Sequence, residues 1–427
     1  MEQPLTQHIN LDDPPAIDAY QRVGGYAALI KTLKEHTPMD IQQQVQASEL
    51  KGRGGAGFST AQKWSFVPMG ADAPHPKYLI ANADEMEPGT FKDRLLLEGN
   101  PHQLLEGMIL AAYAIQADIA YIFLRWAYRR AAALLRKSID EAYHAGYLGK
   151  NILGSGWSLQ LHLHTGVGRY MCGEETALLN ALEGKRATPR AKPPFPAVSG
   201  LFGKPTIVNN VETLCCIPSI VNNGAAWFKG LGRGKEGGTK LYGVSGRVNR
   251  SGCWEFPMGI TVRELLDHAG GMKSGYRLKG FLPGGASTDF LTEQHLDTAM
   301  DFASMAAAGS RLGTGTMVIL DDATCPVGFV HNLQHFFAQE SCGWCTPCRE
   351  GLPWVEKILL SIERGEASAE DIELLHMHTR FLGPGHTFCA LAPGAMEPLQ
   401  SALRFFKDDF DQHITEKKCP YGNHLHR

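Results

Sequence analysis

The sequence predicts an α/β domain with a parallel sheet, followed by a small mixed α/β module and a helical C-terminal region. Three observations lead to this prediction. Apolar strand-like runs alternate with amphipathic helices in the first part of the chain, short β-like pieces separated by glycine-rich loops fill the middle, and helical periodicity dominates from Val327 onward. No segment repeats at a fixed period.

The strand and helix signals of the first part alternate after a polar, helix-prone N-terminal segment. Strand–helix–strand order at this spacing predicts parallel strands, because such crossovers are long enough to return the chain to the same edge of the sheet. The expected strands are 77–81, 119–124 and 158–165, and the expected helices are 102–117 and 125–145.

The rest of the chain changes character after a proline-rich loop at 188–203 and a glycine-rich stretch at 230–238. A mixed module follows, in which β-like pieces at 241–248 and 254–256 precede a helix at 261–268 and further β pieces to Leu320. The C-terminal region is expected to form helices at 330–340, 353–364, 370–382 and 396–410.

Composition excludes several classes of function. The 427 residues are 44% hydrophobic and 20% charged with a net charge of −3, which is typical of a globular protein and gives no indication of nucleic-acid binding. The longest apolar stretch, 104–123, is interrupted by Glu106 and Asp118, so no membrane span is expected. No signal peptide is visible at the start, so the ten cysteines are expected to be reduced thiols.

Three cysteines share one loop at C-x-x-C-x-x-C spacing, within Ser341–Arg349. Such a loop can provide three ligands to an iron–sulfur cube, with Gly343 letting backbone amides approach the sulfurs. Cys389 is the natural fourth ligand. Zinc is the main rival, although structural zinc usually uses two separated pairs, and unrelated core cysteines are the remaining alternative. The predicted ligands are Cys342, Cys345, Cys348 and Cys389.

The other cysteines that stand outside this constellation are expected to be structural. Cys215 and Cys216 lie in an apolar, helix-like run, Cys253 and Cys325 stand alone, and Cys419 lies in a polar tail. The tail histidines His424 and His426 are expected to be solvated.

A glycine-rich loop at 51–58 contains Gly52, Gly54 and Gly57 at G-x-G-x-x-G spacing. A helix, not the strand of the dinucleotide-binding fingerprint, is expected before it. The loop still suits an anion, because glycines expose backbone N–H groups and because Arg53 and Lys63 add positive charge. A flexible turn without a ligand is the alternative.

Two acidic loops follow predicted strands, at 82–89 and 170–176. Ligands of α/β sheets bind at the carboxyl ends of strands, where carboxylates can accept hydrogen bonds from ribose or ribityl hydroxyls. The alternatives are a solvated acidic loop for the first segment and simple helix capping for the second.

Six segments together carry a resemblance to a known family. They are Lys51–Phe58, Asn82–Thr90, Tyr170–Thr176, Lys192–Pro196, Val208–Thr213 and Ser341–Gly351. With them the chain resembles, nearly end to end, the family of NADH-binding flavoprotein subunits (F subunits) of bacterial respiratory complex I, the NADH:quinone oxidoreductase. It departs from the commonest pattern at Met86, where many relatives carry serine.

The resemblance implies four segments: an N-terminal helical segment (1–50), a Rossmann-like FMN-binding domain with an atypical glycine loop (51–235), a β-grasp, ubiquitin-like domain (236–325), and a helical [4Fe-4S] domain with a tail (326–427). The implied cofactor-binding residues are Gly52, Arg53, Gly54, Gly55, Gly57, Lys63, Asn82, Asp84, Glu85, Tyr170, Gly173, Glu174, Glu175, Asn209, Asn210 and Thr213. The implied NADH-binding residues are Phe58, Phe66, Glu87, Lys192 and Phe195. Each Phe taken alone is more often a core residue, and only its place inside these motifs favours the cofactor.

The implied activity is NADH dehydrogenation. NADH would give a hydride to FMN, and FMN would pass single electrons to one [4Fe-4S] cluster. No side chain is required as an acid or base, although Glu85 or Glu175 could tune charge near the flavin. Acidic residues near the nucleotide predict a preference for NADH over NADPH.

The implied partners are a thioredoxin-like [2Fe-2S] subunit and a large multi-cluster subunit, which lead to quinone, and the implied location is the cytoplasmic face of the inner membrane. Two alternatives remain. One is the diaphorase subunit of an NAD-reducing hydrogenase or formate dehydrogenase, whose members often carry extra N-terminal domains. The other is an electron carrier or scaffold subunit without flavin.

Overall fold

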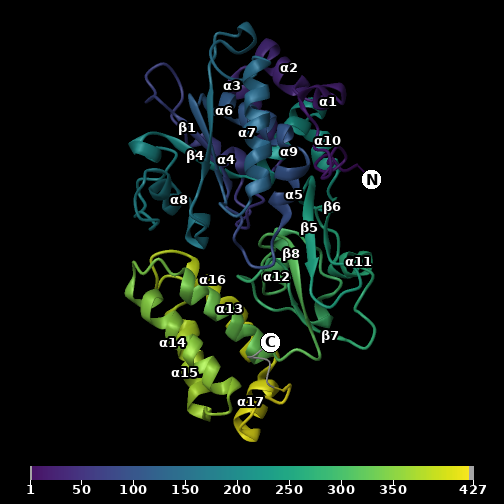
Figure 1. The fold of residues 1–427 in the computed structure, drawn as a ribbon, viewed down its shortest axis with the longest axis vertical. Coiled ribbons are helices and arrows are strands. Elements are labelled where there is room, and N and C mark those ends of the chain that lie inside the picture. The colour runs from purple at the N-terminus through teal and green to yellow at the C-terminus, as the bar shows by residue number, and fades with distance from the viewer. Residues whose placement is uncertain (1, 423–427) are drawn as a thin grey trace. The chain divides into compact units, whose positions relative to one another are not determined.

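The structure, a computed structural model, describes residues 2–422, so His424 and His426 lie outside the described residues. The chain forms two compact units, each described by itself (Figure 1). The first contains the residues up to Met86, Phe91–Leu241 and Trp254–Gly259, and the second contains Glu87–Thr90, Tyr242–Cys253 and the residues from Ile260 on. The finer division into four segments stays a prediction.

The first unit is built on a four-stranded parallel sheet with the order β3-β2-β1-β4. The strands are β1 (Tyr78–Ala83), β2 (Ile119–Leu124), β3 (Gln160–Thr165) and β4 (Thr206–Asn210). This confirms the three predicted parallel strands and adds β4, which was not expected as a strand. Because the chain runs from β1 to β2 and β3 on one side and places β4 on the other, the strand order reverses between β1 and β4.

Helices cover this sheet. The largest are α6 (Pro101–Ile115), α7 (Arg129–His144) and α9 (Val211–Asn223), and the smaller ones are α1 (Ile17–Arg22), α2 (Ala27–Glu35), α3 (Pro38–Ala47), α4 (Thr60–Ser65), α5 (Lys92–Gly99), α8 (Glu175–Leu182) and α10 (Ala225–Gly230). Helix α6 is buried on nearly all sides. Its Gly107 allows this, because a Cβ there would lie only 2.0 Å from the Leu214 carbonyl oxygen of α9.

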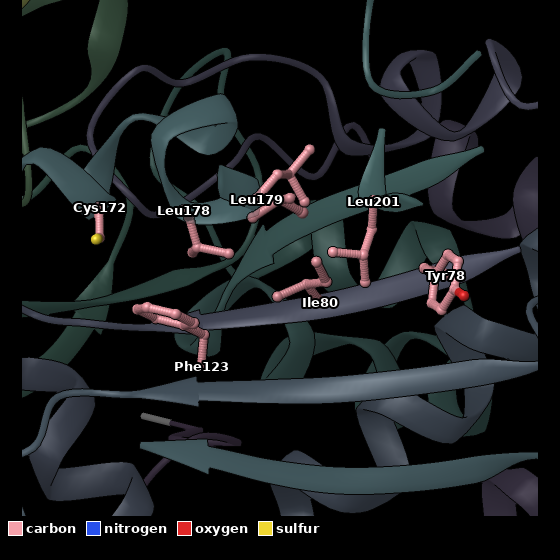
Figure 2. Close-up of a cluster of buried hydrophobic side chains, with 8 residues drawn as sticks. Tyr78, Ile80, Phe123, Cys172, Leu178, Leu179 and Leu201 are labelled. Atoms are coloured by element: carbon pink, nitrogen blue, oxygen red, sulfur yellow. The ribbon is translucent and has the colours of Figure 1, made fainter. Parts of the chain in front are cut away.

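A hydrophobic cluster joins the sheet to α8 and the loops around it (Figure 2). Tyr78 and Ile80 of β1 and Phe123 of β2 pack against Leu178 and Leu179 of α8. All five side chains are at least nine-tenths buried, and Cys172 of the 170–176 segment packs in the same cluster.

The second unit contains most of a mixed sheet with the order β6-β5-β8-β7. Its strands are β5 (Thr239–Ser245), β6 (Gly252–Pro257), β7 (Leu278–Leu282) and β8 (Thr316–Asp321); β5 and β8 are parallel, whereas β7 and β8 are antiparallel. The helices α11 (Val262–His268) and α12 (Phe302–Ala307) lie between strands in the sequence. The predicted small mixed α/β module is confirmed.

The C-terminal helices are α13 (Pro326–Glu340), α14 (Thr346–Glu363), α15 (Ala369–Phe381), α16 (Leu391–Phe405) and α17 (Lys407–Glu416). Helix α14 begins at Thr346, ahead of its predicted start at Pro353, because Pro347 fits the first turn. The single helix predicted at 396–410 is wrong. The helix is interrupted at Phe406, which has a non-helical ψ of 27° and whose ring packs edge-on against Phe290 at 5.2 Å. Within residues 2–422 no helix is both long and apolar enough to cross a membrane.

Candidate flavin crevice and iron–sulfur loop

The predicted asparagines meet at the carboxyl ends of β1 and β4. Asn82 of β1 is in register with Asn210 of β4, and Asn209 precedes it. The Asn209 side chain is fixed by a hydrogen bond of 2.9 Å from the Trp64 indole N–H to its Oδ1 atom. Because the strand order reverses between β1 and β4, this is the edge where ligands of open α/β sheets bind.

The glycine loop closes over the same edge. The loop runs between α3 and α4, which confirms that a helix and not a strand precedes it, and Gly52 N–H donates to the Phe58 carbonyl at 2.8 Å. The Arg53 N–H donates to Thr213 Oγ1 at 2.8 Å, which docks the loop on the first turn of α9. A Cβ on Gly54 would lie 3.1 Å from the Asn210 Cβ, so a side chain there would crowd the loop against β4.

The two cations expected to face an anion have protein partners instead. The Arg53 side chain is buried, and its guanidinium donates to the Gly237 and Thr239 carbonyls at 3.4 and 3.2 Å. The Lys63 ammonium donates to Glu175 at 2.7 Å and to the Val208 carbonyl at 2.8 Å. That these two charges also attract an anion therefore stays a prediction. Because the Gly52 and Arg53 N–H groups are bonded within the protein, an anion at this loop would have to bind the backbone N–H groups of residues 54–57.

A buried charge network, which the sequence patterns did not indicate, holds Asn210 in place. Lys92 lies 2.6 Å from Asp93, 2.9 Å from Glu212 and 3.2 Å from Asn210 Oδ1, and Asn210 Nδ2 donates to Asp93 at 2.6 Å. Lys240 adds a second cation 3.2 Å from Glu212. Lys92 begins α5, Glu212 lies in the first turn of α9 and Lys240 lies in β5, so no local sequence pattern joins them.

The electrostatics of this network follow from its geometry. Burial by itself raises the pKa of Glu212, but Lys240, Lys92 and Arg53 outweigh it and hold that pKa at about 2. Burial lowers the pKa of Lys240 to about 8. Glu212 is therefore an anion throughout the physiological range.

The first acidic loop is not the solvated segment of the alternative interpretation, since Asp84 and Glu85 are buried. The Glu85 carboxylate accepts hydrogen bonds from the N–H groups of Asp93 and Arg94 at 2.9 and 3.2 Å and from the Tyr128 hydroxyl at 2.9 Å. Burial raises the pKa of Glu85 to about 7, with the Asp93 carboxylate adding to the effect.

Two other acidic residues of the predicted site are also engaged by the protein. Glu87 lies in the second unit, where its carboxylate accepts from the Ser287 N–H at 2.7 Å. Glu174 caps α8 by accepting from the Ala177 N–H at 2.8 Å, as the capping alternative predicts. Lys192 lies 3.2 Å from Glu174 and 3.1 Å from Glu175, which ties the proline-rich loop to the start of α8.

The three phenylalanines predicted to contact the nucleotide are all exposed. Phe58, Phe66 and Phe195 have exposed fractions of 49%, 52% and 58%. Side chains with about half of their surface exposed are not core residues, so the core alternative is excluded for each of them. Glycine backbone, amides and flat apolar surface are the groups that a phosphate, a polyol and a planar ring require, so the residues present fit FMN.

The four predicted cluster cysteines are neighbours at the start of α14 and in the loop before α16. Burial raises the pKa of Cys348 to about 12, and the nearby thiols of Cys345, Cys389 and Cys342 add to this effect. The Trp344 and Phe388 rings meet edge to face at 6.2 Å and join the two loops. Gly343 has a φ of 74°, which lets the loop turn tightly. This donor set fits a [4Fe-4S] cluster.

Comparisons with known proteins agree with this geometry. Residues 45–219 match the family described as the Nuo51 FMN-binding domain, 241–290 match the SLBB domain, and 328–413 match the NADH-ubiquinone oxidoreductase-F iron-sulfur binding region. The chain is 55% identical to the NADH-quinone oxidoreductase F subunit of Escherichia coli (strain K12) over 98% of its length and 94% of that protein. It is 50% identical to the F 2 subunit of Rhizobium meliloti (strain 1021), covering 98% and 99%.

Among solved structures, an NAD⁺-reducing [NiFe]-hydrogenase in the H₂-reduced state matches with a TM-score of 0.84 at 36% identity, covering 98% of this chain and 67% of that one. The fold and site define a flavin- and iron–sulfur-containing NADH oxidoreductase. The identity over nearly full length further shows that the chain belongs to the family of NADH-quinone oxidoreductase F subunits. The hydrogenase likeness stays the alternative, and the scaffold alternative without flavin does not fit the matched FMN-binding region.

Proposed function

We propose that the crevice at the carboxyl ends of β1 and β4 holds FMN and that NADH binds beside it. The observation that carries this proposal is the meeting of the glycine loop, Asn82 and Asn210 at the point where the strand order reverses. The residues proposed to hold FMN are Gly52, Arg53, Gly54, Gly55, Gly57, Lys63, Asn82, Asp84, Glu85, Tyr170, Gly173, Glu174, Glu175, Asn209, Asn210 and Thr213.

FMN, when bound, accepts the two electrons of the NADH hydride and supplies single electrons to a [4Fe-4S] cluster. The chain's residues position these groups. Gly54 leaves room above Asn210, and Lys92 and Asp93 fix the Asn210 amide, so its orientation is set before a ligand arrives. The Glu85 carboxylate binds the start of α5 and fixes that helix beside the proposed site.

The nucleotide is proposed to lie against Phe58, Phe66 and Phe195, whose exposed rings offer flat apolar surface. Lys192 and Glu87 complete the proposed nucleotide-binding set. The cluster ligands are proposed to be Cys342, Cys345, Cys348 and Cys389. Ser341 Oγ lies 3.2 Å from Cys348 Sγ, and a hydrogen bond there stabilises a thiolate ligand.

The chain works as one subunit of a larger NADH-quinone oxidoreductase, as the names of its relatives state for them. The proposed direct partners are a thioredoxin-like [2Fe-2S] subunit and a large multi-cluster subunit, and the proposed location is the cytoplasmic face of the inner membrane. The proposal rests on family membership.

Flavin content and NADH:ferricyanide reduction of the purified full chain test the proposal. Gly54→Ala should lower both, because its new methyl group would press on Asn210. Gly230→Ala is the matched control, since a Cβ there has no neighbour within 4 Å. A wild-type chain that carries iron but neither binds FMN nor reduces ferricyanide with NADH would refute the proposed function.

A further inference from the structure

Four potential metal ligands come together at the end of the α13–α14 pair that lies away from the iron–sulfur loop. They are Cys325, which precedes α13, Glu363, the last residue of α14, His413 of α17, and Cys419 beyond α17. One ligand atom from each lies within 4.8 Å of all the others. Cys325, Glu363 and His413 are almost completely buried. The sequence offered no spacing signal for this group, because its members are far apart in the chain.

Three of the distances match one face of a small coordination tetrahedron. Cys325 Sγ lies 3.2 Å from Glu363 Oε2 and 3.3 Å from His413 Nε2, and these last two atoms are 3.2 Å apart. Bonds of about 2.0–2.3 Å from zinc to oxygen, nitrogen and sulfur place tetrahedral ligand atoms roughly 3.3–3.8 Å apart. The ligand atoms of Cys325, Glu363 and His413 are therefore already near the spacing that a zinc ion requires, and Cys419 Sγ lies within 4.8 Å of each of them.

Backbone groups orient the ligands as they do in metal sites. His413 Nδ1 donates to the Asp409 carbonyl at 2.6 Å, so the Nε2 lone pair is directed at Cys325 and Glu363. The Gly328 N–H donates to Cys325 Sγ at 3.3 Å, and the Tyr421 backbone N–H donates to the Cys419 sulfur. Such N–H donors stabilise thiolates.

A hydrogen-bonded cluster without metal is the competing explanation. An imidazolium on His413 paired with the Glu363 carboxylate would account for their 3.2 Å contact. It leaves Glu363 Oε1 buried without a hydrogen-bond partner among the described residues, although such an atom is costly to bury. In that cluster the Cys325 thiol donates to Glu363 Oε2 at 3.2 Å, and the Cys419 thiol is hydrogen-bonded to the same carboxylate.

We propose that Cys325, Glu363, His413 and Cys419 form a structural zinc site. Two thiolates and one imidazole are ligands that zinc prefers, and calcium and magnesium, which take oxygen ligands, are excluded by them. Four protein ligands close the coordination sphere and leave no position for a substrate, so the role is structural.

The site is separate from the iron–sulfur loop. Cys325 directly precedes α13 and Cys342 follows its end, and fifteen helical residues at about 1.5 Å each span roughly 22 Å. The helix pair is thus fixed by metal at both ends. Zinc also holds the segment after α17 over the end of α14, where Lys417 Nζ donates to the Ala367 carbonyl at 2.7 Å.

Metal analysis of the full-length chain, purified anaerobically and incubated with zinc chloride before desalting, tests the site. We expect about one zinc per chain, and zinc X-ray absorption should show two sulfur and two nitrogen or oxygen neighbours. The double variant Cys325→Ser, Cys419→Ser should lose the zinc and keep its iron. Cys253→Ser, which alters another half-buried cysteine of the same unit, should keep both.

The wild-type result decides the proposal even if the double variant fails to fold. A wild-type chain without zinc, or a zinc ion surrounded by four sulfurs, would overturn it, and four sulfurs would place the zinc on the iron–sulfur cysteines. Zinc retained by the double variant would overturn it too. Flavin and iron contents, measured on the same samples, report separately on the proposed function.

Discussion

Replacing Glu212 by Gln should destabilise the first unit strongly, because it removes the anion on which two buried lysines depend. Glu212 is fully buried, 2.9 Å from Lys92 and 3.2 Å from Lys240, and also accepts from the Leu241 N–H at 2.8 Å. Gln keeps the shape of the side chain and one oxygen that can accept a hydrogen bond. The change therefore isolates the charge.

Two independent routes give the magnitude. A carboxyl whose pKa falls from 4.5 to about 2 contributes about 3 kcal/mol at neutral pH. Removing one partner of a buried ion pair costs about 3–5 kcal/mol, because the remaining charge is left uncompensated. For a unit of this size either value corresponds to a fall in Tm of roughly 6–20 °C. Since the folded pKa is depressed, this stabilisation is present above about pH 4.5 and is lost as pH falls toward 2.

Thermal and urea unfolding of the Glu212→Gln variant, followed by FMN release and circular dichroism, measures the effect. The matched control is Glu49→Gln, which removes an exposed ion pair with Lys229 and should change stability by less than about 1 kcal/mol. Equal unfolding midpoints for Glu212→Gln and wild type would refute the reasoning that the network needs this charge.

Three further predictions concern the crevice. Asn210→Ala should weaken FMN binding by about 5- to 150-fold, because a buried hydrogen-bonding group worth about 1–3 kcal/mol is lost. A flavin fluorescence titration measures this, and the control variant Asn223→Ala, at the other end of α9, should bind FMN normally. Phe195→Ala should raise KM for NADH without lowering Tm. Phe381→Ala, which alters a side chain equally exposed at 58% but in the other unit, should leave KM unchanged, and an unchanged KM in both variants would count against the nucleotide assignment. Burial raises the pKa of Glu85 to about 7, so the unfolded state loses this proton at a lower pH than the folded state does. The free energy of unfolding should therefore fall as the pH rises from about 4.5 to 7, and this decline should be shallower in Glu85→Gln.

The sequence predicted the parts of this molecule whose signals are local. Strand β2 was predicted at its observed bounds, since six apolar residues lie between turn residues. The glycine loop was predicted because its composition is unusual over eight residues. The break at Phe406 was not predicted, because a contact between its ring and the distant Phe290 ring leaves no local signal in the sequence.

Sites assembled from distant residues were harder to predict. The charge network joins Lys92 to Glu212 and Lys240, and no short-range pattern connects these three positions. Arg53 was identified as part of the glycine loop, but only the fold shows that its guanidinium is directed at the carbonyls of Gly237 and Thr239. Spacing identifies which residues share a loop, whereas side-chain direction depends on packing.

The central claim is that electrons enter this chain from NADH at the β1–β4 crevice and leave through a cluster on Cys342, Cys345, Cys348 and Cys389. Anaerobic electron paramagnetic resonance of the full chain, loaded with FMN and iron and mixed with NADH, tests it directly. We predict a reduced four-iron signal in wild type that is lost or strongly weakened in Cys389→Ser, while that variant still binds FMN. No signal in wild type, or an unchanged signal in Cys389→Ser, would contradict the account.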